Sequence, residues 1–171
     1  MKKIISLLLC LSTVLLCACG IQQGDDSVQT PFYYLRDPDA YVYGSPEGVI
    51  SFEHRDITGH KDELNYLLML YLKGPLDEAL ESPFPEGCSI LQTNERNGRL
   101  SVMLNSSFTT LKGMELTLAC VCMARTCFSL TDAHSIRITA KAADGTVPID
   151  ETITINSLLL EETKLPAENS E

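Results

Sequence analysis

One segment, residues 110–131, constrains the fold more than any other because apolar residues cover most of its circumference. Arranged as a helix, it carries two apolar stripes, one formed by Leu111, Met114, Leu118, Val121 and Cys122 and the other by Leu116, Cys120, Met123, Cys127 and Leu130. A helix that is apolar nearly all round belongs inside a protein. We therefore expect this helix to be deeply buried.

A second, amphipathic helix is predicted at about residues 60–73. Its single apolar stripe has the spacing i, i+3, i+4, i+7 and i+8 and consists of Leu64, Leu67, Leu68, Tyr71 and Leu72. Thr58 is suited to cap its start. Gly74 fits the left-handed position just after a helix, and Pro75 prevents the helix from continuing.

The strands are predicted from alternation of apolar and polar residues. Residues 32–36 are rich in aromatic residues, and residues 49–57 alternate, with Ile50, Phe52 and His54 on one side and Ser51, Glu53 and Arg55 on the other. This period of two indicates a half-buried strand. Asn97-Gly98, between two alternating runs, is a strong hairpin signal.

Further strands complete the predicted order β-β-α-β-β-α-β. The strand after the hairpin turns Leu100, Val102 and Leu104 to the core, residues 135–141 form the next strand, and "TITINSLLL" adds a final one. The length of 171 residues suits one domain. We predict a single two-layer α+β domain, with a mixed, largely antiparallel sheet and two main helices packed on it.

The N-terminus has the pattern of a secretory signal peptide. A positive start, Met1-Lys2-Lys3, precedes an uncharged run up to Ala18, which is shorter than the roughly 20 residues of a bilayer span. Leu16-Cys17-Ala18-Cys19 resembles a bacterial lipobox. The resemblance implies lipidation of Cys19, with palmitate-type acyl chains, and a mature chain anchored to the outer face of the cytoplasmic membrane.

The predicted organisation therefore has four parts: signal peptide 1–18, flexible tether 19–30, folded domain 31–160 and acidic disordered tail 161–171. Removal of Lys2 and Lys3 leaves 11 of the 13 basic residues against 23 acidic ones, so the net charge changes from −10 to −12. Such a charge argues against nucleic acid as a partner, because phosphate binding needs clustered Lys and Arg.

The remaining cysteines are Cys88, Cys120, Cys122 and Cys127. On one helix, Cys120 and Cys127 would lie roughly 10 Å apart, too far for a disulfide, and no paired zinc-binding spacing is present. Buried, hydrophobic cysteines are the simplest interpretation. A bridge from Cys88 to a helix cysteine stays open, as does a thiol enzyme using one of the four with His54, His60 or His134.

No catalytic, metal-binding or cofactor-binding motif is found in the sequence. The ordered set of motifs resembles the GerMN domain, the sporulation and germination domain of Gram-positive bacteria. The residues that carry the resemblance are Leu72, Gly74 and Pro75 at a helix end, Pro85 and Gly87 at a turn, Val102, Leu104, Ser106 and Phe108 at a strand end, and Thr126 in the long helix.

The resemblance implies a non-enzymatic domain, without catalytic residues, metal or cofactor, that contacts other envelope or sporulation proteins. Its Gly-Pro and Pro-x-Gly positions would serve as a helix stop and as a turn ahead of the hairpin. Self-association is left open. The alternative is a lipoprotein that binds a solute or a cell-wall ligand in a small pocket.

Overall fold

The computed structural model describes residues 27–37 and 48–162. Cys19, the signal peptide, most of the predicted tether and residues 163–171 lie outside this part. The elements, in chain order, are β1 (Gln29–Arg36), β2 (Ile50–Asp56), α2 (Leu64–Leu72), β3 (Leu80–Glu81), β4 (Ile90–Arg96), β5 (Arg99–Leu104), the 3₁₀ helix η1 (Ser106–Thr110), α3 (Gly113–Leu130), β6 (Ser135–Ala140), β7 (Ile149–Thr154) and α4 (Ile155–Glu162).

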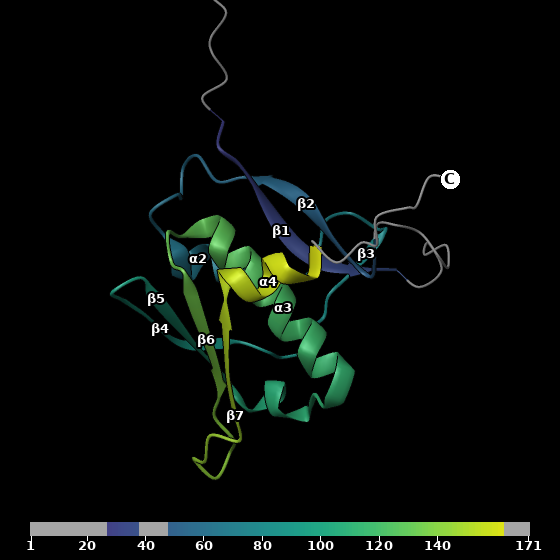
Figure 1. Ribbon diagram of the computed structural model, residues 1–171. Helices are drawn as coiled ribbons and strands as arrows, with labels where there is room; N and C mark the ends of the chain where they lie inside the picture. Colours follow the sequence, from purple (N-terminus) through teal and green to yellow (C-terminus); the bar gives the residue numbers. More distant parts are fainter. Residues whose placement is uncertain (1–26, 38–47, 163–171) are drawn as a thin grey trace, which may run out of the picture.

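The predicted α+β class is confirmed, but the strands form two sheets instead of one (Figure 1). The first has the order β2-β1-β3 and is antiparallel; the second has the order β4-β5-β6-β7, with a parallel β5–β6 pair between antiparallel ones. The two sheets share α3, which contacts β1 of the first and β6 and β7 of the second. The core therefore lies around this helix.

The core holds the side chains that the strand patterns turn inward. Leu100, Val102 and Leu104 of β5 and Ile136 and Ile138 of β6 are fully buried. Within the described ranges, α3 is the helix whose length and hydropathy match a membrane span. Because it packs against both sheets, these properties are those of a core helix.

The burial of α3 is less complete than its sequence predicts. Its buried residues lie between Ala119 and Cys127, whereas Met114 in the first turn is 72% exposed. Met114 is therefore left uncovered, whereas Leu116 in the next turn is half-buried against the core. The expected final strand is also wrong in part, because β7 ends at Thr154 and "INSLLLEE" forms α4.

Both ends of α2 are set by the residues outside it. The helix begins at Leu64, not near residue 60, and Thr58 is not its cap. The Thr58 hydroxyl instead donates to Asp56 Oδ1 at 2.5 Å and accepts the Val28 N–H at 2.8 Å, which joins the segment before β1 to the end of β2. At the other end Gly74 adopts φ +101°, which a side chain would disfavour, and the chain leaves through Pro75.

β2 presents the opposite face from the one its hydrophobicity favours. Phe52 is 46% exposed, while the side chains of Glu53 and Arg55 are only 10% and 12% exposed. The Arg55 guanidinium donates to the Gly74 carbonyl at 2.7 Å, the Leu70 carbonyl at 3.2 Å and the Tyr34 hydroxyl at 2.8 Å. It therefore caps the C-terminus of α2, where a cation is favourable.

Glu53 completes this buried network. Its carboxylate accepts from Arg55 Nε at 2.7 Å and from the backbone N–H groups of Leu76 and Asp77 at 2.8 and 2.9 Å. Glu53 and Arg55 thus fasten the α2–β3 connection to β2. Four acceptors around one guanidinium, the Glu53 carboxylate among them, and three donors around one carboxylate provide the partners that buried charges require.

β3 covers only part of one edge of β1, and side chains from two helices form hydrogen bonds with the backbone of the remaining part. β3 is only two residues long and pairs with Leu35 and Arg36, so it does not reach Tyr33. The Tyr33 N–H donates to Thr126 Oγ1 of α3 at 2.9 Å, and its carbonyl accepts from the Tyr71 hydroxyl of α2 at 2.6 Å. Both helices are therefore hydrogen-bonded to β1 in place of a missing strand partner.

The two turns predicted near the hairpin have tight local geometry. Gly87 adopts φ +74° after Pro85, and its carbonyl accepts from the Asn105 side chain at 2.7 Å. Asn97 and Gly98 adopt φ +54° and +69°, which suits a two-residue hairpin loop. A Cβ on Gly98 would lie 2.3 Å from Cε1 of His134, so the turn rests on this ring.

Replacing Gly98 with Ala is expected to lower the free energy of unfolding by about 1–2 kcal/mol, because an L-residue is strained at positive φ, and to displace the His134 ring. Gly145→Ala is the matched control: its φ is +87°, but no atom lies within 4 Å of the added Cβ. Urea unfolding should show a similar loss for both variants. Only Gly98→Ala should shift the His134 ring signals in NMR spectra, and unchanged signals would contradict the close contact.

Candidate functional site

The outer face of the four-stranded sheet is polar and open, whereas its inner face forms the core. The register aligns outward side chains in three rows across the strands. From β4 to β7 these rows are Arg96–Arg99–Ser135–Thr154, Asn94–Ser101–Arg137–Thr152 and Gln92–Met103–Thr139–Asp150. We call these residues the outer face.

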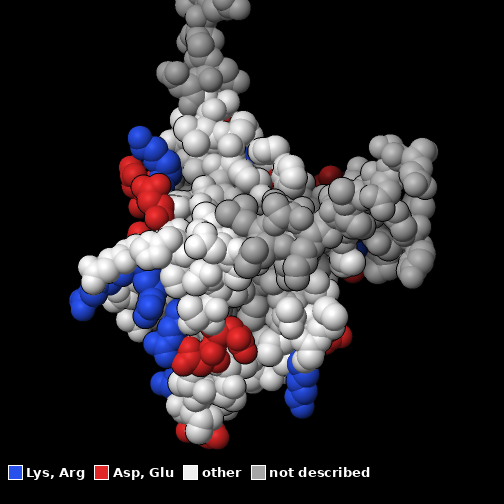
Figure 2. Space-filling model, viewed as in Figure 1, with Lys and Arg blue, Asp and Glu red and all other residues white. Residues whose placement is uncertain are grey.

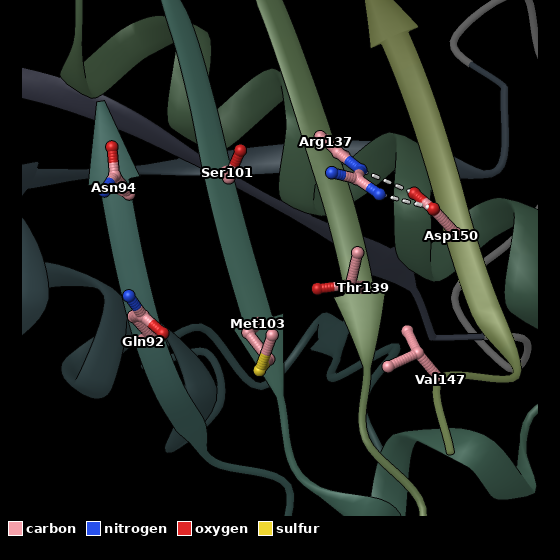
Figure 3. A pocket seen from close by; sticks show the side chains of 8 residues that line it. All are labelled: Gln92, Asn94, Ser101, Met103, Arg137, Thr139, Val147 and Asp150. Carbon is pink, nitrogen blue, oxygen red and sulfur yellow. Dashed lines mark hydrogen bonds and ion pairs between the residues drawn. The ribbon is translucent and has the colours of Figure 1, made fainter. Parts of the chain in front are cut away.

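Short side chains in the middle of the outer face leave a hollow of about 310 Å³ (Figure 3). Ser101 and Thr139 form its floor, between Asn94 and Gln92 on β4 and the longer Arg137 and Asp150 on β6 and β7. Its remaining lining residues, Met103 and Val147, are apolar and lie toward one end. The hollow is therefore lined by hydroxyl, amide and charged groups together with apolar surface.

An ion pair bounds one side of the hollow. Arg137 Nε and Nη2 donate to the two carboxylate oxygens of Asp150 at 2.7 and 2.6 Å. These hydrogen bonds lower the pKa of Asp150 and raise that of Arg137. Both side chains are 46% exposed. Both side chains remain partly exposed to solvent, and their opposite charges cancel on this side of the outer face.

A second hollow, of about 380 Å³, opens at the hairpin end of the same sheet and is lined by Arg96, Asn97, Arg99 and His134. Arg96 and Arg99 are direct cross-strand partners. Neither guanidinium makes an ion pair or hydrogen bond with the described part of the chain. Figure 2 shows basic side chains gathered over β4, β5 and β6, beside acidic ones over β7. This end is therefore cationic in an acidic protein.

The four described cysteines are buried or half-buried and free, so the bridge from Cys88 is not present. Burial raises the pKa of the Cys88 thiol to about 11 and those of Cys120, Cys122 and Cys127 to about 12. These thiols stay protonated at neutral pH, and the thiolate is the reactive form. The part of the chain described contains no cluster of three His, Cys, Asp or Glu residues arranged for a metal.

Thiol labelling checks this arrangement. In the folded mature chain at pH 7, a maleimide should label Cys88 slowly and leave the three α3 cysteines unmodified, because burial limits both access and ionisation. In urea all four should react. Intact-mass and peptide mass spectrometry give the sites. Rapid modification of any α3 cysteine in the folded chain would contradict this placement and favour a thiol nucleophile.

The turn and cap residues predicted from the sequence lie at three separate places in the structure. Gly74 and Pro75 lie at the end of α2, Pro85 and Gly87 at the turn before β4, and Asn97 and Gly98 at the hairpin beside the second hollow. The outer face itself was not predicted. The only sequence signal for the outer face is the alternation of polar residues in β4, β5 and β6. Its rows depend on the parallel pairing of β5 with β6, two segments that are distant in the sequence.

Comparisons with known proteins find similarity among the solved structures. No family model matches the chain, and no curated protein matches it. The solved structure of the tandem GerMN domains of the sporulation protein GerM from Bacillus subtilis aligns with a TM-score of 0.49 and 18% identity over 80% of this chain. The alignment covers 48% of that protein, so this chain spans about half its length.

Proposed function

We propose that this chain is an extracytoplasmic lipoprotein, anchored through Cys19, whose α+β domain acts without catalysis as a protein-interaction module at the cell envelope. The proposed context is sporulation or germination. The anchor rests on the charged start, the short apolar run and the lipobox-like Leu16-Cys17-Ala18-Cys19. The context rests on the ordered sequence motifs that resemble a GerMN domain.

The observation that favours an interaction module is the outer face. It is a broad, open sheet surface on which polar side chains from four strands are aligned and the Gln92, Asn94 and Ser101 side chains have no hydrogen-bond partner in the described ranges. Polar groups that are already positioned, and are not used within the domain, are available to a partner. Low mobility of a sheet keeps the entropic cost of docking small.

The anchor is tested by metabolic labelling with an alkyne analogue of palmitate. The wild-type chain and Cys88→Ser should be labelled, whereas Cys19→Ser should not. Intact mass should show loss of residues 1–18 and addition of lipid. Labelling of Cys19→Ser, or an unlipidated wild-type chain in the membrane fraction, would refute lipidation at this residue.

The interaction role is tested by affinity capture of the full mature chain from detergent-solubilised sporulating and vegetative cells. Wild type should recover a reproducible partner, and Ser101→Arg, which fills the hollow with a cation, should lose it. Thr117→Arg introduces the same side chain on an exposed position of α3 and should retain the partner. Recovery of the protein alone under both conditions counts against the proposal.

The alternative, a small-ligand-binding lipoprotein, is favoured by one observation. The hollow of about 310 Å³ is at the lower end of the size of ligand pockets. A soluble peptidoglycan unit, one disaccharide with its peptide, would then raise the unfolding temperature in a concentration-dependent manner. Wild type should respond and Ser101→Arg should not. No shift with this probe, together with capture of a protein partner, decides for the interaction module.

A further inference from the structure

The cationic end of the outer face has a charge arrangement that is unfavourable without a partner. Arg96 and Arg99 lie directly opposite each other on neighbouring strands, and like charges in this position destabilise a sheet. The four residues that line the hollow include no carboxylate. A hollow with two guanidinium groups that have no ion-pair partner in the described part of the chain is suited to bidentate binding of an anionic group.

The hairpin holds this end in a fixed shape. Gly98 lies close to the His134 ring. The backbone N–H of His134 donates to the Gly98 carbonyl at 2.9 Å. The hairpin tip is thus fastened to the residue just before β6. Arg96 and Arg99 flank the two-residue loop, so this contact holds their backbone in place. The entropic cost of ordering them when a ligand binds is therefore small.

The charge changes along the outer face. Beyond Arg96 and Arg99, the next row contains Arg137, which Asp150 already neutralises, and the hollow beside this pair is lined by uncharged side chains, most of them amides and hydroxyls. A polyanion or an anionic membrane surface is bound by many cations spread along it. Among the outer-face residues, the cations without an ion pair in the described ranges are Arg96 and Arg99 at one end, and a neutral hollow with hydrogen-bonding groups follows them.

We infer that the outer face binds an extended peptide segment of a partner protein that carries a carboxylate at one end. The carboxylate would lie between Arg96 and Arg99, and the peptide amides would reach the amide and hydroxyl groups of Asn94 and Ser101. Charge complementarity supports this occupant. The cationic end of the outer face matches one carboxylate, and the neutral hollow beside it matches an uncharged stretch of peptide. The inference rests on the proposed interaction function and specifies the chemistry of its partner.

The test titrates ¹⁵N-labelled mature chain, in a neutral detergent, with acetyl-Gly-Ser-Asn-Glu bearing a free carboxyl terminus. The Nε–Hε signals of Arg96 and Arg99 and the Asn94 side-chain amide should shift together, with half-saturation on the order of 1 mM, the affinity of a weak single contact. The same peptide ending in Gln amide should leave the arginine signals unchanged.

Two variants make the test specific. Arg96→Gln/Arg99→Gln should weaken the response of the Asn94 amide at least about tenfold, equivalent to 1.4 kcal/mol. Lys141→Gln removes one charge from the opposite end of β6 without touching the hollow and should bind as wild type does. Loss of binding in both variants would indicate a general charge effect and overturn the inference.

Other outcomes also overturn it. Equal shifts with the neutral peptide, no shifts up to about 10 mM, or binding at least tenfold tighter to polyglycerol phosphate or phosphatidylglycerol vesicles would each do so.

The proposed function fails separately. If affinity capture recovers the same partner with wild type and Arg96→Gln/Arg99→Gln, the interaction role stands and this inference falls; if no partner is captured, the role falls whatever the peptide does.

Discussion

Replacing Arg55 with Met is expected to lower the free energy of unfolding by about 3–5 kcal/mol, the usual result of removing one partner of a buried ion pair. Glu53 would be left with a buried carboxylate and no cation. The carbonyls of Leu70 and Gly74 would lose their charged donor. The guanidinium also lies over the Phe32 ring, 5.0 Å from its centroid, and this contact would be lost.

Urea unfolding of wild type, Arg55→Met, Glu53→Gln and the double variant measures this effect. The double variant should lose less than the sum of the two single losses, because each single change strands the other charge. Arg137→Met is the matched control, since it breaks a hydrogen-bonded but exposed ion pair and should cost much less than Arg55→Met. Equal losses for Arg55→Met and Arg137→Met would contradict a structural role for the Glu53–Arg55 network.

Replacing Thr126 with Val is expected to lower the free energy of unfolding by about 1–3 kcal/mol, because the Tyr33 N–H would lose its acceptor. Thr126 is fully buried, and Val has nearly the same shape, so the core packing stays the same. The Tyr33 amide should also exchange with solvent faster than in wild type. Tyr71→Phe, which removes the donor to the Tyr33 carbonyl, should have a similar cost.

Thr117→Val provides the control on the same helix. The Thr117 hydroxyl donates to the Gly113 carbonyl within α3 and is exposed, so this change should stay within about 0.5 kcal/mol of wild type. Unfolding curves for the two variants and hydrogen exchange at Tyr33 give the comparison. A Thr126→Val loss no larger than that of Thr117→Val would show that β1 does not depend on this helix for its edge.

Elements with a local signal could be predicted from the sequence. The Asn97-Gly98 turn fixes its own backbone geometry, and the apolar stripe of α2 follows from its 3.6-residue period. Fold class followed from the order of these elements. Thr126 was singled out by the resemblance, but its role as an acceptor for Tyr33 depends on β3 being too short to cover β1, which no pattern in the sequence states.

The errors occurred where tertiary contacts override hydrophobicity. The alternation in β2 favoured Phe52 as the inward residue, yet Arg55 lies inside because the end of α2 and Tyr34 offer it acceptors. The stripe in α3 predicts Met114 inside, but this residue lies in the first turn, ahead of the buried stretch that begins at Ala119. The outer face could not be predicted because β5 and β6 are separated by the whole of α3, so their register is visible only in the structure.

The most direct test of the central claim is photo-crosslinking in cells that produce the protein. A photoreactive amino acid at Asn94, on the outer face, should give a discrete covalent adduct with another envelope protein in the membrane fraction. The same residue at Thr117, exposed on α3, should give none. The absence of an adduct at Asn94, or equal adducts at both positions, would contradict the account of the outer face as the interaction surface of a membrane-anchored module.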